Sequence, residues 1–387
     1  MTFRRVAERL RLGVAFGTAA LSSVMLPSTL AVAMPDPPAD SAVLSYPALR
    51  PTLLGTAGVL LFSDSPETPT RSGVLYRDTV QGNTVQGGTA QSRTRVLAYH
   101  VNGLGRPARL LLLARNLEAQ HLDGQQTSLS VLRQGSAVTR QPDPVIGQQT
   151  LLRYFSSGPR PLRPLGGTQQ RVLYDSGLLA PGSVVSLLLD LESSAALELS
   201  VVILGQSERL ENELPILPAD AFHQRGTFLG ADRTLSTALP SDAGTPFRLT
   251  LSGPDDPPLQ GYDALTGNPQ RLMGNYGVLY TLRVTGAAGR LLAASPRGGA
   301  YRGTALLQDG AGLNGGSARP SQMLKGQVLI GRGRALKDPA APAALWQIRS
   351  QDFRLQIVPA NGSSLPLALL FYPGKVNRDT GDHSTGR

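Results

Sequence analysis

The stretch GNYGVLYTLRV, residues 274–284, decides the fold class of this chain. Two glycines flank a turn, and an alternating apolar pattern follows in which Val278, Tyr280 and Leu282 share one face. A phosphate-binding loop with such glycines leads into a helix, whose N-terminal N–H groups hold the anion. Because a strand pattern follows here instead, the stretch predicts the entry into a covered central β-strand.

The same texture of short apolar runs between turn residues continues along the chain. The sequence contains 43 glycines and 30 prolines, and this density disfavours long helices, since an interior proline costs about 3 kcal/mol and a glycine about 1 kcal/mol. Val96–Val101 and Arg109–Arg115 flank Asn102–Gly105, a pattern that predicts a β-hairpin. We therefore expect an all-β protein with two antiparallel β-sandwich domains joined by a short linker.

The N-terminus has the order of a secretory signal peptide. Arginines at positions 4, 5, 9 and 11 precede an apolar run over 12–26 and the small residues Ala31-Val32-Ala33. The apolar run is shorter than the roughly 20 residues of a membrane-spanning helix, so we expect cleavage before Met34 and no transmembrane segment afterwards. The expected location is the periplasm or the cell surface.

Changes in composition divide the rest of the chain. We expect a signal peptide over 1–33, a proline-rich extended lead-in over 34–51, an N-terminal β-sandwich over 52–206, a linker over 207–225, a C-terminal β-sandwich over 226–373 and a disordered tail over 374–387. Within the linker, Glu208–Glu213 suggests a short helix or an irregular connection.

Composition also excludes several classes of function. The chain has no cysteine, which excludes disulfides, thiolate metal sites and thiol nucleophiles. Its formal net charge is +10, which suits contact with anionic wall polymers. The arginines are dispersed rather than clustered with aromatic residues, so we expect no nucleic-acid binding.

Few residues suggest a chemical site. Asp255-Asp256 lies in a glycine- and proline-rich stretch without the alternating spacing of a calcium loop, which favours a surface turn. His100, His121 and His223 are the candidate ligands of a copper or zinc site. Structural histidines are the simpler interpretation, and no catalytic residues or cofactor-binding residues are predicted.

Several short motifs occur in an order that resembles a family of exported bacterial proteins, mainly cyanobacterial, which is catalogued only as a domain of unknown function. The motifs are LFSDSPE (61–67), LAYH (97–100), LSVLRQGS (129–136), QPD (141–143), GNYGV (274–278) and YRGT (301–304). The motif residues include Asp64, Ser65, Pro66, Gly274, Asn275, Tyr276 and Gly277. The resemblance implies an envelope or extracellular location and no established catalytic residues. Members of the family often carry paired histidines where this chain has Tyr99-His100.

The functional prediction is an exported cell-envelope protein that acts as a non-catalytic accessory or structural subunit of a surface-layer or outer-membrane assembly. Its expected partners are envelope or surface-layer proteins. One alternative is a copper-dependent oxidoreductase of superoxide-dismutase type that uses the three histidines. A second alternative is a carbohydrate-binding module, in which Trp346 or exposed tyrosines would stack on sugars.

Overall fold

The structure is a computed structural model that describes residues 40–80, 93–117, 127–166, 170–210, 213–242, 244–309, 327–330 and 345–374. Every described residue belongs to one compact unit. The predicted signal peptide and all but the first residue of the predicted tail lie outside the described residues. No described helix has both the length and the apolar character needed to cross a bilayer.

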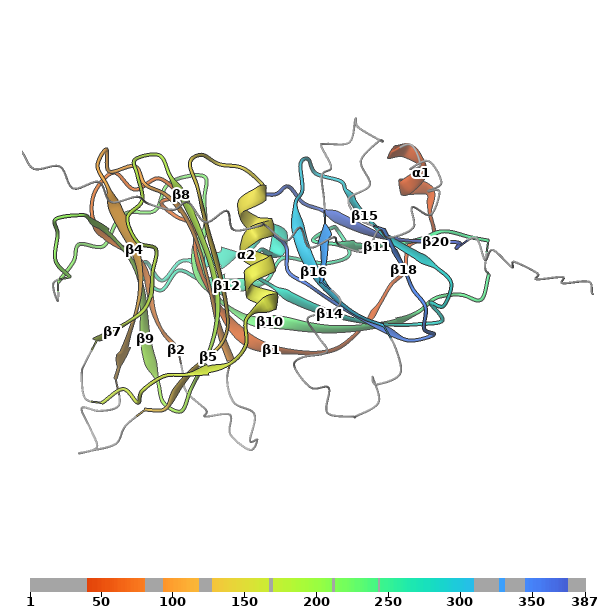
Figure 1. The fold of residues 1–387 in the computed structure, drawn as a ribbon, viewed down its shortest axis with the longest axis horizontal. Helices are drawn as coiled ribbons and strands as arrows, with labels where there is room; N and C mark the ends of the chain where they lie inside the picture. Colours follow the sequence, from red (N-terminus) through yellow and green to blue (C-terminus); the bar gives the residue numbers. More distant parts are fainter. Residues whose placement is uncertain are drawn as a thin grey trace, which may run out of the picture. The chain divides into compact units, whose positions relative to one another are not determined.

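Strands make up most of the described chain, which confirms the all-β prediction (Figure 1). The elements up to residue 205 are α1 (Asp40–Ser45), β1 (Thr52–Ser63), β2 (Gly73–Val80), β3 (Arg93–Val101), β4 (Ala108–Asn116), β5 (Leu129–Thr139), α2 (Val145–Ser156), β6 (Arg160–Pro161), β7 (Gln170–Asp175), β8 (Val184–Ser193) and β9 (Leu197–Gly205).

The later elements follow the same pattern of short strands. They are β10 (Arg225–Ala238), β11 (Phe247–Leu251), β12 (Gln260–Tyr262), β13 (Pro269–Arg271), the 3₁₀ turn η2 (Met273–Asn275), β14 (Leu279–Thr285), β15 (Leu291–Pro296), β16 (Gly303–Asp309), β17 (Gln327–Ile330), β18 (Leu345–Gln347), β19 (Phe353–Ile357) and β20 (Leu367–Tyr372).

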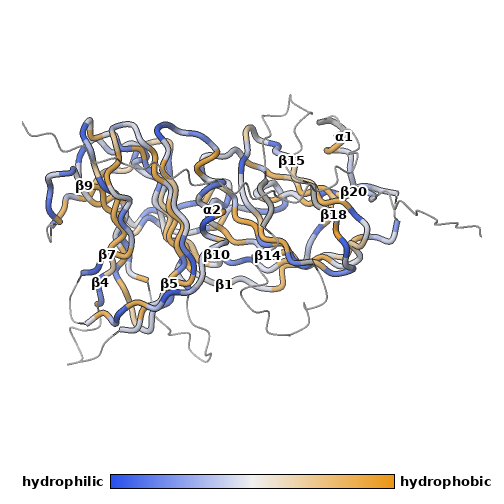
Figure 2. The backbone as a smooth tube through the Cα atoms, viewed as in Figure 1, coloured by the Kyte–Doolittle hydropathy of each residue, from blue (hydrophilic) through white to orange (hydrophobic). Residues whose placement is uncertain are grey.

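The described strands form one large sheet and two four-stranded sheets. The 12-stranded sheet has the order β17-β16-β19-β14-β10-β1-β3-β8-β5-β6, and β12 and β13 extend it beside β10. One core lies between β3 and β8 of this sheet and the small sheet β2-β9-β4-β7. A second core lies between β14 and β19 and the small sheet β11-β20-β15-β18. Apolar residues recur along the strands of both cores (Figure 2), as in a sandwich.

The long pair β1 and β10 connects the first half of the chain to the second. Their antiparallel register runs from Thr52 opposite Ser236 to Ser63 opposite Arg225. A β-bulge interrupts it between Ala57 and Val59, where Gly58 and Gly230 have φ of 73° and 76°. Glycine tolerates this left-handed backbone and thereby permits the local bend. Strands from both sides of 207–225 thus share one sheet, while the division into two domains at that segment stays a prediction.

Two strand pairs differ from the expected antiparallel arrangement. β1 pairs with β3 in parallel, and β10 pairs with β14 in parallel. Between β1 and β3 the chain crosses to the small sheet to form β2, and it therefore returns to the large sheet in its original direction. The alternation of side chains along a strand carries no information on this direction, which is why the sequence did not reveal it.

The predicted hairpin between 96–101 and 109–115 is wrong, although both strands exist. β3 pairs with β1 and β8 in the large sheet, whereas β4 pairs with β7 and β9 in a small sheet. The Asn102 side chain fixes the connection between the sheets: its amide donates to the carbonyl oxygens of Arg106 and Leu179, and its oxygen accepts from the Leu104 N–H. These bonds turn the chain into the second layer instead of back along the first.

Two helical segments also depart from the sequence prediction. Part of the lead-in expected to be extended forms α1, and α2 was not predicted. The helix α2 buries Ile146, Leu151, Tyr154 and Phe155 on one side. In the linker, residues 208–210 form no helix.

The turn at Gly274–Gly277 leads into β14, as predicted. β14 lies between β10 and β19, and the side chains of Leu279, Tyr280, Thr281 and Leu282 are all buried. A strand therefore occupies the place where a phosphate loop would need a helix.

A buried arginine on β3 joins the elements around this centre. The Arg95 side chain is 1% exposed. Its Nε and Nη2 donate to the two carboxylate oxygens of Asp190 on β8 at 2.8 and 3.0 Å, and its Nη1 donates to Asp232 on β10 at 2.8 Å. Nη1 also donates to the carbonyl of Gly277 at 3.2 Å, and Tyr154 of α2 donates its hydroxyl proton to Asp190 at 2.7 Å. One guanidinium thus fixes β3, β8, β10 and the entry to β14, and α2 joins through Asp190.

Replacing Arg95 by methionine is expected to lower the free energy of unfolding by roughly 3–5 kcal/mol, because the buried carboxylate of Asp190 loses its cation. The matched control is Arg93→Met. Arg93 approaches the same two aspartates at 4.0 and 3.5 Å, but its side chain is 39% exposed, so its loss should stay below about 1 kcal/mol. Urea unfolding measures both values. Equal losses for the two variants would contradict the central role of Arg95.

Candidate functional site

Two of the motif segments, LFSDSPE and LAYH, meet at the ends of β1 and β3. Ser63 closes β1, and His100 lies near the end of β3. The Ser63 hydroxyl donates to Nε2 of His100 at 2.9 Å, and Nδ1 of His100 donates to the Pro66 carbonyl at 2.9 Å. This direction follows because a carbonyl can only accept, so Nδ1 must carry the proton. The backbone N–H of Val101 adds a bond to the Glu67 carbonyl at 2.8 Å.

His100 is a structural group in this arrangement. Ser63 and His100 are both fully buried, and both nitrogens of the ring have partners. Burial lowers the pKa of His100 from 6.5 to about 4, against the opposing effect of its hydrogen bonds. The imidazole is therefore neutral at physiological pH and holds the LFSDSPE segment against β3.

Asp64 lies next to Ser63 in this cluster of motif residues, and its surroundings destabilise the charged form of its carboxyl group. One of its carboxylate oxygens, Oδ1, is buried without a hydrogen-bond partner. Burial raises the pKa of the Asp64 carboxyl well above its usual value, and the nearby charges of Glu67 and Asp220 raise it further. An arrangement that destabilises a charged group is typical of functional sites more often than of structural ones. In its protonated form this carboxyl can donate a hydrogen bond to an incoming acceptor.

Asp220 fixes the loop that faces this segment. Its carboxylate accepts from the backbone N–H groups of Glu67 at 2.8 Å, Phe222 at 2.9 Å and His223 at 2.7 Å. Although burial raises the Asp220 pKa, these donors lower it below its usual value overall. The backbone N–H of Asp220 in turn donates to the hydroxyl of Ser65 at 2.9 Å.

The His223 ring adds contacts within the same loop and to the LFSDSPE segment. Its Nδ1 lies 3.0 Å from both carboxylate oxygens of Asp220, and its Nε2 lies 2.7 Å from the Glu67 carboxylate. The loop 220–223 is thus fixed to the LFSDSPE segment by backbone and side-chain bonds.

Phe222 projects from this fixed loop into solvent. Its side chain is 91% exposed, and a second apolar side chain, Met273, is 59% exposed. The Gln224 side chain joins the two segments, since its oxygen accepts from the Met273 N–H at 3.0 Å. An exposed phenylalanine on a backbone that is already ordered is suited to contact a partner, because little conformational entropy remains to be lost on binding.

The GNYG turn lies beside the cluster and contributes Tyr276 to it. Tyr276 donates its hydroxyl proton to the carbonyl of Ser363 at 2.6 Å. Burial raises the Tyr276 pKa to about 12, with a further contribution from the charge of nearby Asp64. Gly274 has φ of 78°, and a Cβ there would lie 2.7 Å from the Tyr276 ring.

Asn275 and Gly277 have structural roles in the same turn. The Asn275 side-chain oxygen accepts from the Leu259 N–H at 3.0 Å, and the Gly277 carbonyl accepts from Arg95. The seven motif residues therefore divide: Asp64, Ser65, Pro66 and Tyr276 belong to the cluster, while Gly274, Asn275 and Gly277 shape the turn beside it.

The candidate metal ligands are only partly placed. His100 and His223 both contact the LFSDSPE segment, through Pro66 and Glu67, whereas His121 lies outside the described residues. Both nitrogens of His100 and of His223 contact protein atoms. Within the described ranges no group of three or more histidine, aspartate or glutamate side chains is arranged to hold a metal ion. The copper hypothesis stays a prediction, as does sugar stacking by Trp346, whose side chain is not described.

Sequence reasoning missed two residues of the site, Asp220 and Phe222. The segment Asp220-Ala221-Phe222-His223 falls in the stretch interpreted as a linker. The available signal was an aspartate two residues before an aromatic residue, a spacing at which an aspartate accepts from following backbone N–H groups.

The Asp64→Asn variant is expected to be more stable than the wild type at pH 7. The folded-state pKa of Asp64 is raised, so the folded protein gains stability relative to the unfolded chain as pH falls through that pKa. At neutral pH the carboxylate therefore destabilises the fold, by about 1.4 kcal/mol for each unit of pKa increase. Urea unfolding of both proteins between pH 7 and pH 4 should show an advantage of the variant that shrinks toward acid. A variant that is less stable at pH 7 would contradict the unfavourable environment of Asp64.

The His100→Gln variant tests the opposite sign. The folded-state pKa of His100 is lowered, so its stabilising contribution is complete above pH 6.5 and is lost as pH falls from 6.5 toward about 4. The wild type should lose roughly 3 kcal/mol from this group over that interval. The variant should be less stable at pH 7, and the gap between the two proteins should narrow toward pH 4. A gap that is independent of pH would rule out a buried neutral imidazole.

Comparison with known proteins does not place the chain in a family. No family model and no curated protein matches its sequence. A search of solved structures found the CUB1-EGF-CUB2 domains of rat MASP-1, at 10% identity over 81% of this chain and 99% of that chain, with a TM-score of 0.19. It also found the same domains of human MASP-1/3, at 12% identity over 76% and 98%, with a TM-score of 0.19. Deformed wing virus carrying the GFP gene matches at 10% identity over 95% and 99%, with a TM-score of 0.18. Similarities at these TM-scores carry no argument about fold or function.

Proposed function

We propose that the protein is an exported, non-catalytic accessory or structural subunit of a cell-envelope assembly, and that the Phe222 loop contacts a protein partner. The observation that carries the proposal is the 91% exposed side chain of Phe222 on a loop fixed by Asp220 and His223. Aromatic residues often supply most of the binding energy at protein interfaces. The ordered loop lowers the entropic cost of that contact.

The neighbouring polar groups support a binding role over a catalytic one. Ser63 and His100 have the residue types of a nucleophile and its base, but both are fully buried and together hold the LFSDSPE segment. The His223 ring is likewise held between Glu67 and Asp220. These side chains fix the shape of the surface that presents Phe222.

The wider composition agrees with an envelope location. The N-terminal sequence has the order of a signal peptide, the chain has no cysteine, and its net charge is +10. A basic protein is attracted to anionic wall polymers, which would concentrate it near an envelope partner.

The test is a pull-down from detergent-solubilised native envelope with the purified mature protein. We expect the wild type to retain a stoichiometric envelope protein. Phe222→Ala should weaken that association by about 30-fold, because truncation of an aromatic hot-spot residue costs about 2 kcal/mol or more. Leu178→Ala is the matched control, because Leu178 is also exposed, at 58%, and takes no part in the hydrogen bonds that fix the Phe222 loop. Its binding should be unchanged.

Two outcomes would contradict the proposal. A wild-type protein that is recovered alone, also after mild cross-linking, would exclude the subunit role. Equal retention by the wild type and Phe222→Ala would exclude Phe222 as the contact.

A further inference from the structure

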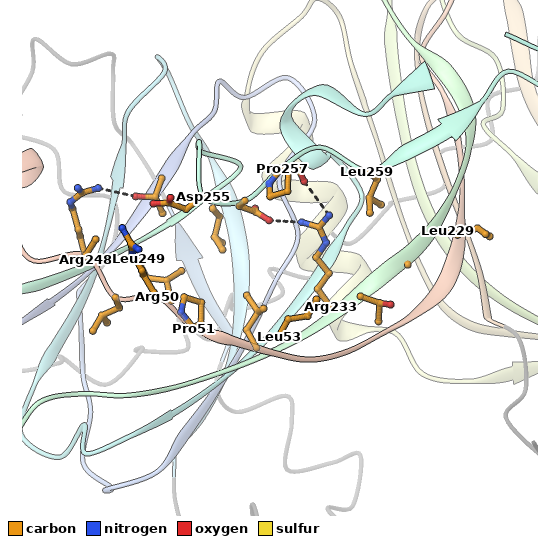
Figure 3. Close-up of a pocket in the computed structure, with 18 residues that line it drawn as sticks. Arg50, Pro51, Leu53, Leu229, Arg233, Arg248, Leu249, Asp255, Pro257 and Leu259 are labelled. Atoms are coloured by element: carbon orange, nitrogen blue, oxygen red, sulfur yellow. Dashed lines mark hydrogen bonds and ion pairs between the residues drawn. The ribbon is translucent and has the colours of Figure 1, made fainter. Parts of the chain in front are cut away.

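A cavity of about 530 Å³ opens beside the edge strand β11 (Figure 3). Its walls come from the chain before and at the start of β1, from β10, from β11 and from the loop after β11. Its volume lies within the range of small-molecule sites in proteins.

The cavity has an apolar base and an apolar mouth. Leu249, Leu251 and Leu259 are 2%, 1% and 8% exposed and form part of the hydrophobic core. Leu53 and Leu229 also line the cavity, yet they are 54% and 70% exposed. A ligand that covered Leu53 and Leu229 would remove their apolar surface from water, which favours binding.

Of the arginines that line the cavity, one forms an ion pair with a described residue and two do not. Arg233 forms an ion pair with Asp256, which also accepts from the Ser252 N–H at 2.7 Å and from the Tyr280 hydroxyl at 2.5 Å. The charges of Arg233 and Asp256 therefore compensate each other within the protein.

Two other arginines lack a carboxylate partner in the described part of the chain. Arg248 donates to the Tyr46 carbonyl at 3.0 Å and to the Thr250 hydroxyl at 3.5 Å, which are neutral acceptors. Arg50 is exposed and forms no ion pair with any described residue. Asp255 also lines the cavity, so Arg50, Arg248 and Asp255 together carry a formal charge of +1. In Figure 3, Arg50 and Arg248 lie toward one end of the cavity and Leu229 toward the other.

A peptide strand is poorly suited to this place. The edge of β11 is already paired with the segment 47–49, since Leu49 N–H donates to the Arg248 carbonyl at 2.7 Å and Arg248 N–H donates to the Pro47 carbonyl at 3.1 Å. This backbone pairing leaves less of the edge open for strand addition. Recognition must therefore rely on the leucine surface and the arginine side chains.

We propose that this cavity binds a single-chain amphiphile with an anionic head group. The acyl chain lies on the leucine surface from Leu249 toward Leu229, and the head group lies at Arg50 and Arg248. The cavity and the Phe222 loop consist of different residues, so a failure of ligand binding would not affect the proposed subunit role.

The test is calorimetric titration of the purified mature protein below the critical micelle concentration of each probe. Dodecanoate and dodecyl phosphate distinguish a fatty acid from a phosphate-bearing lipid, and dodecanol is the uncharged control. We expect saturable 1:1 binding of at least one anion. Each buried methylene contributes about fourfold in affinity, so decanoate, which is two methylenes shorter, should bind roughly 15-fold more weakly than dodecanoate.

Matched variants locate the two ends of the ligand. Leu229→Asp should weaken binding of the preferred anion at least about tenfold. Leu178→Asp, a similarly exposed leucine outside the cavity lining, should leave it unchanged. Arg50→Gln should weaken the anion and spare dodecanol, whereas Arg140→Gln, at an exposed arginine outside the lining, should affect neither.

Three results would overturn the proposal. They are the lack of saturable binding by either anion, affinity that does not depend on chain length, and equal affinity in Leu229→Asp and the wild type.

Discussion

The buried guanidinium of Arg95 is the interaction on which the arrangement of this molecule depends. A desolvated charge is tolerated only where geometry and hydrogen bonds compensate it, and Asp190 and Asp232 supply that compensation from β8 and β10. The same group reaches the carbonyl before β14, and Tyr154 of α2 completes the network through Asp190. An ion pair of this kind is directional, whereas hydrophobic burial is not. The leucine-rich cores provide the driving force for folding, and the Arg95 network favours one arrangement of the strands over others.

The charges around Asp64 in the motif cluster differ in sign from those around Arg95: Asp64 faces like charges, whereas Arg95 faces opposite ones. Arg95 is surrounded by opposite charges, whereas Asp64 lies near Glu67 and Asp220, which carry the same charge as its own carboxylate. Around it, Ser63, Ser65 and His100 use their polar atoms to hold the backbone. The fold thus contains one polar centre in which opposite charges compensate each other and one in which the surroundings destabilise a carboxylate. The second centre adjoins the loop that exposes Phe222, which is why we place function there.

Local patterns in the sequence predicted many of the strands, although not the long pair β1 and β10, and they did not reveal which strands pair. The alternation after Gly277 predicted β14, and the apolar runs at 96–101 and 109–115 predicted β3 and β4. The assignment of β3 and β4 to different sheets depends on the Asn102 side chain, whose acceptors include the distant Leu179 carbonyl. Arg95 looked like one of many dispersed arginines, because its partners lie on other strands. The helix α2 escaped notice since its sequence, VIGQQTLLRYFS, is short and contains a glycine and several β-branched or aromatic residues. Of the site, the motif residues around Asp64 were found, but the loop with Phe222 was taken for a linker.

The pairing of β1 with β10 has a consequence for the way the chain acquires its structure. β1 is the first of the described strands in chain order, yet one of its two neighbours in the sheet begins only at Arg225. Such a contact between distant segments is slow to form, because a long loop must close first. During synthesis the leading strand therefore keeps an unsatisfied backbone edge while most of the chain is still being made, and unpaired edges promote aggregation. The partners of Thr52–Ala57 in β10 are synthesised last, and this end of β1 remains solvent-exposed even in the finished fold. Nascent chains of this protein therefore need more protection from association with one another than chains that fold through local hairpins.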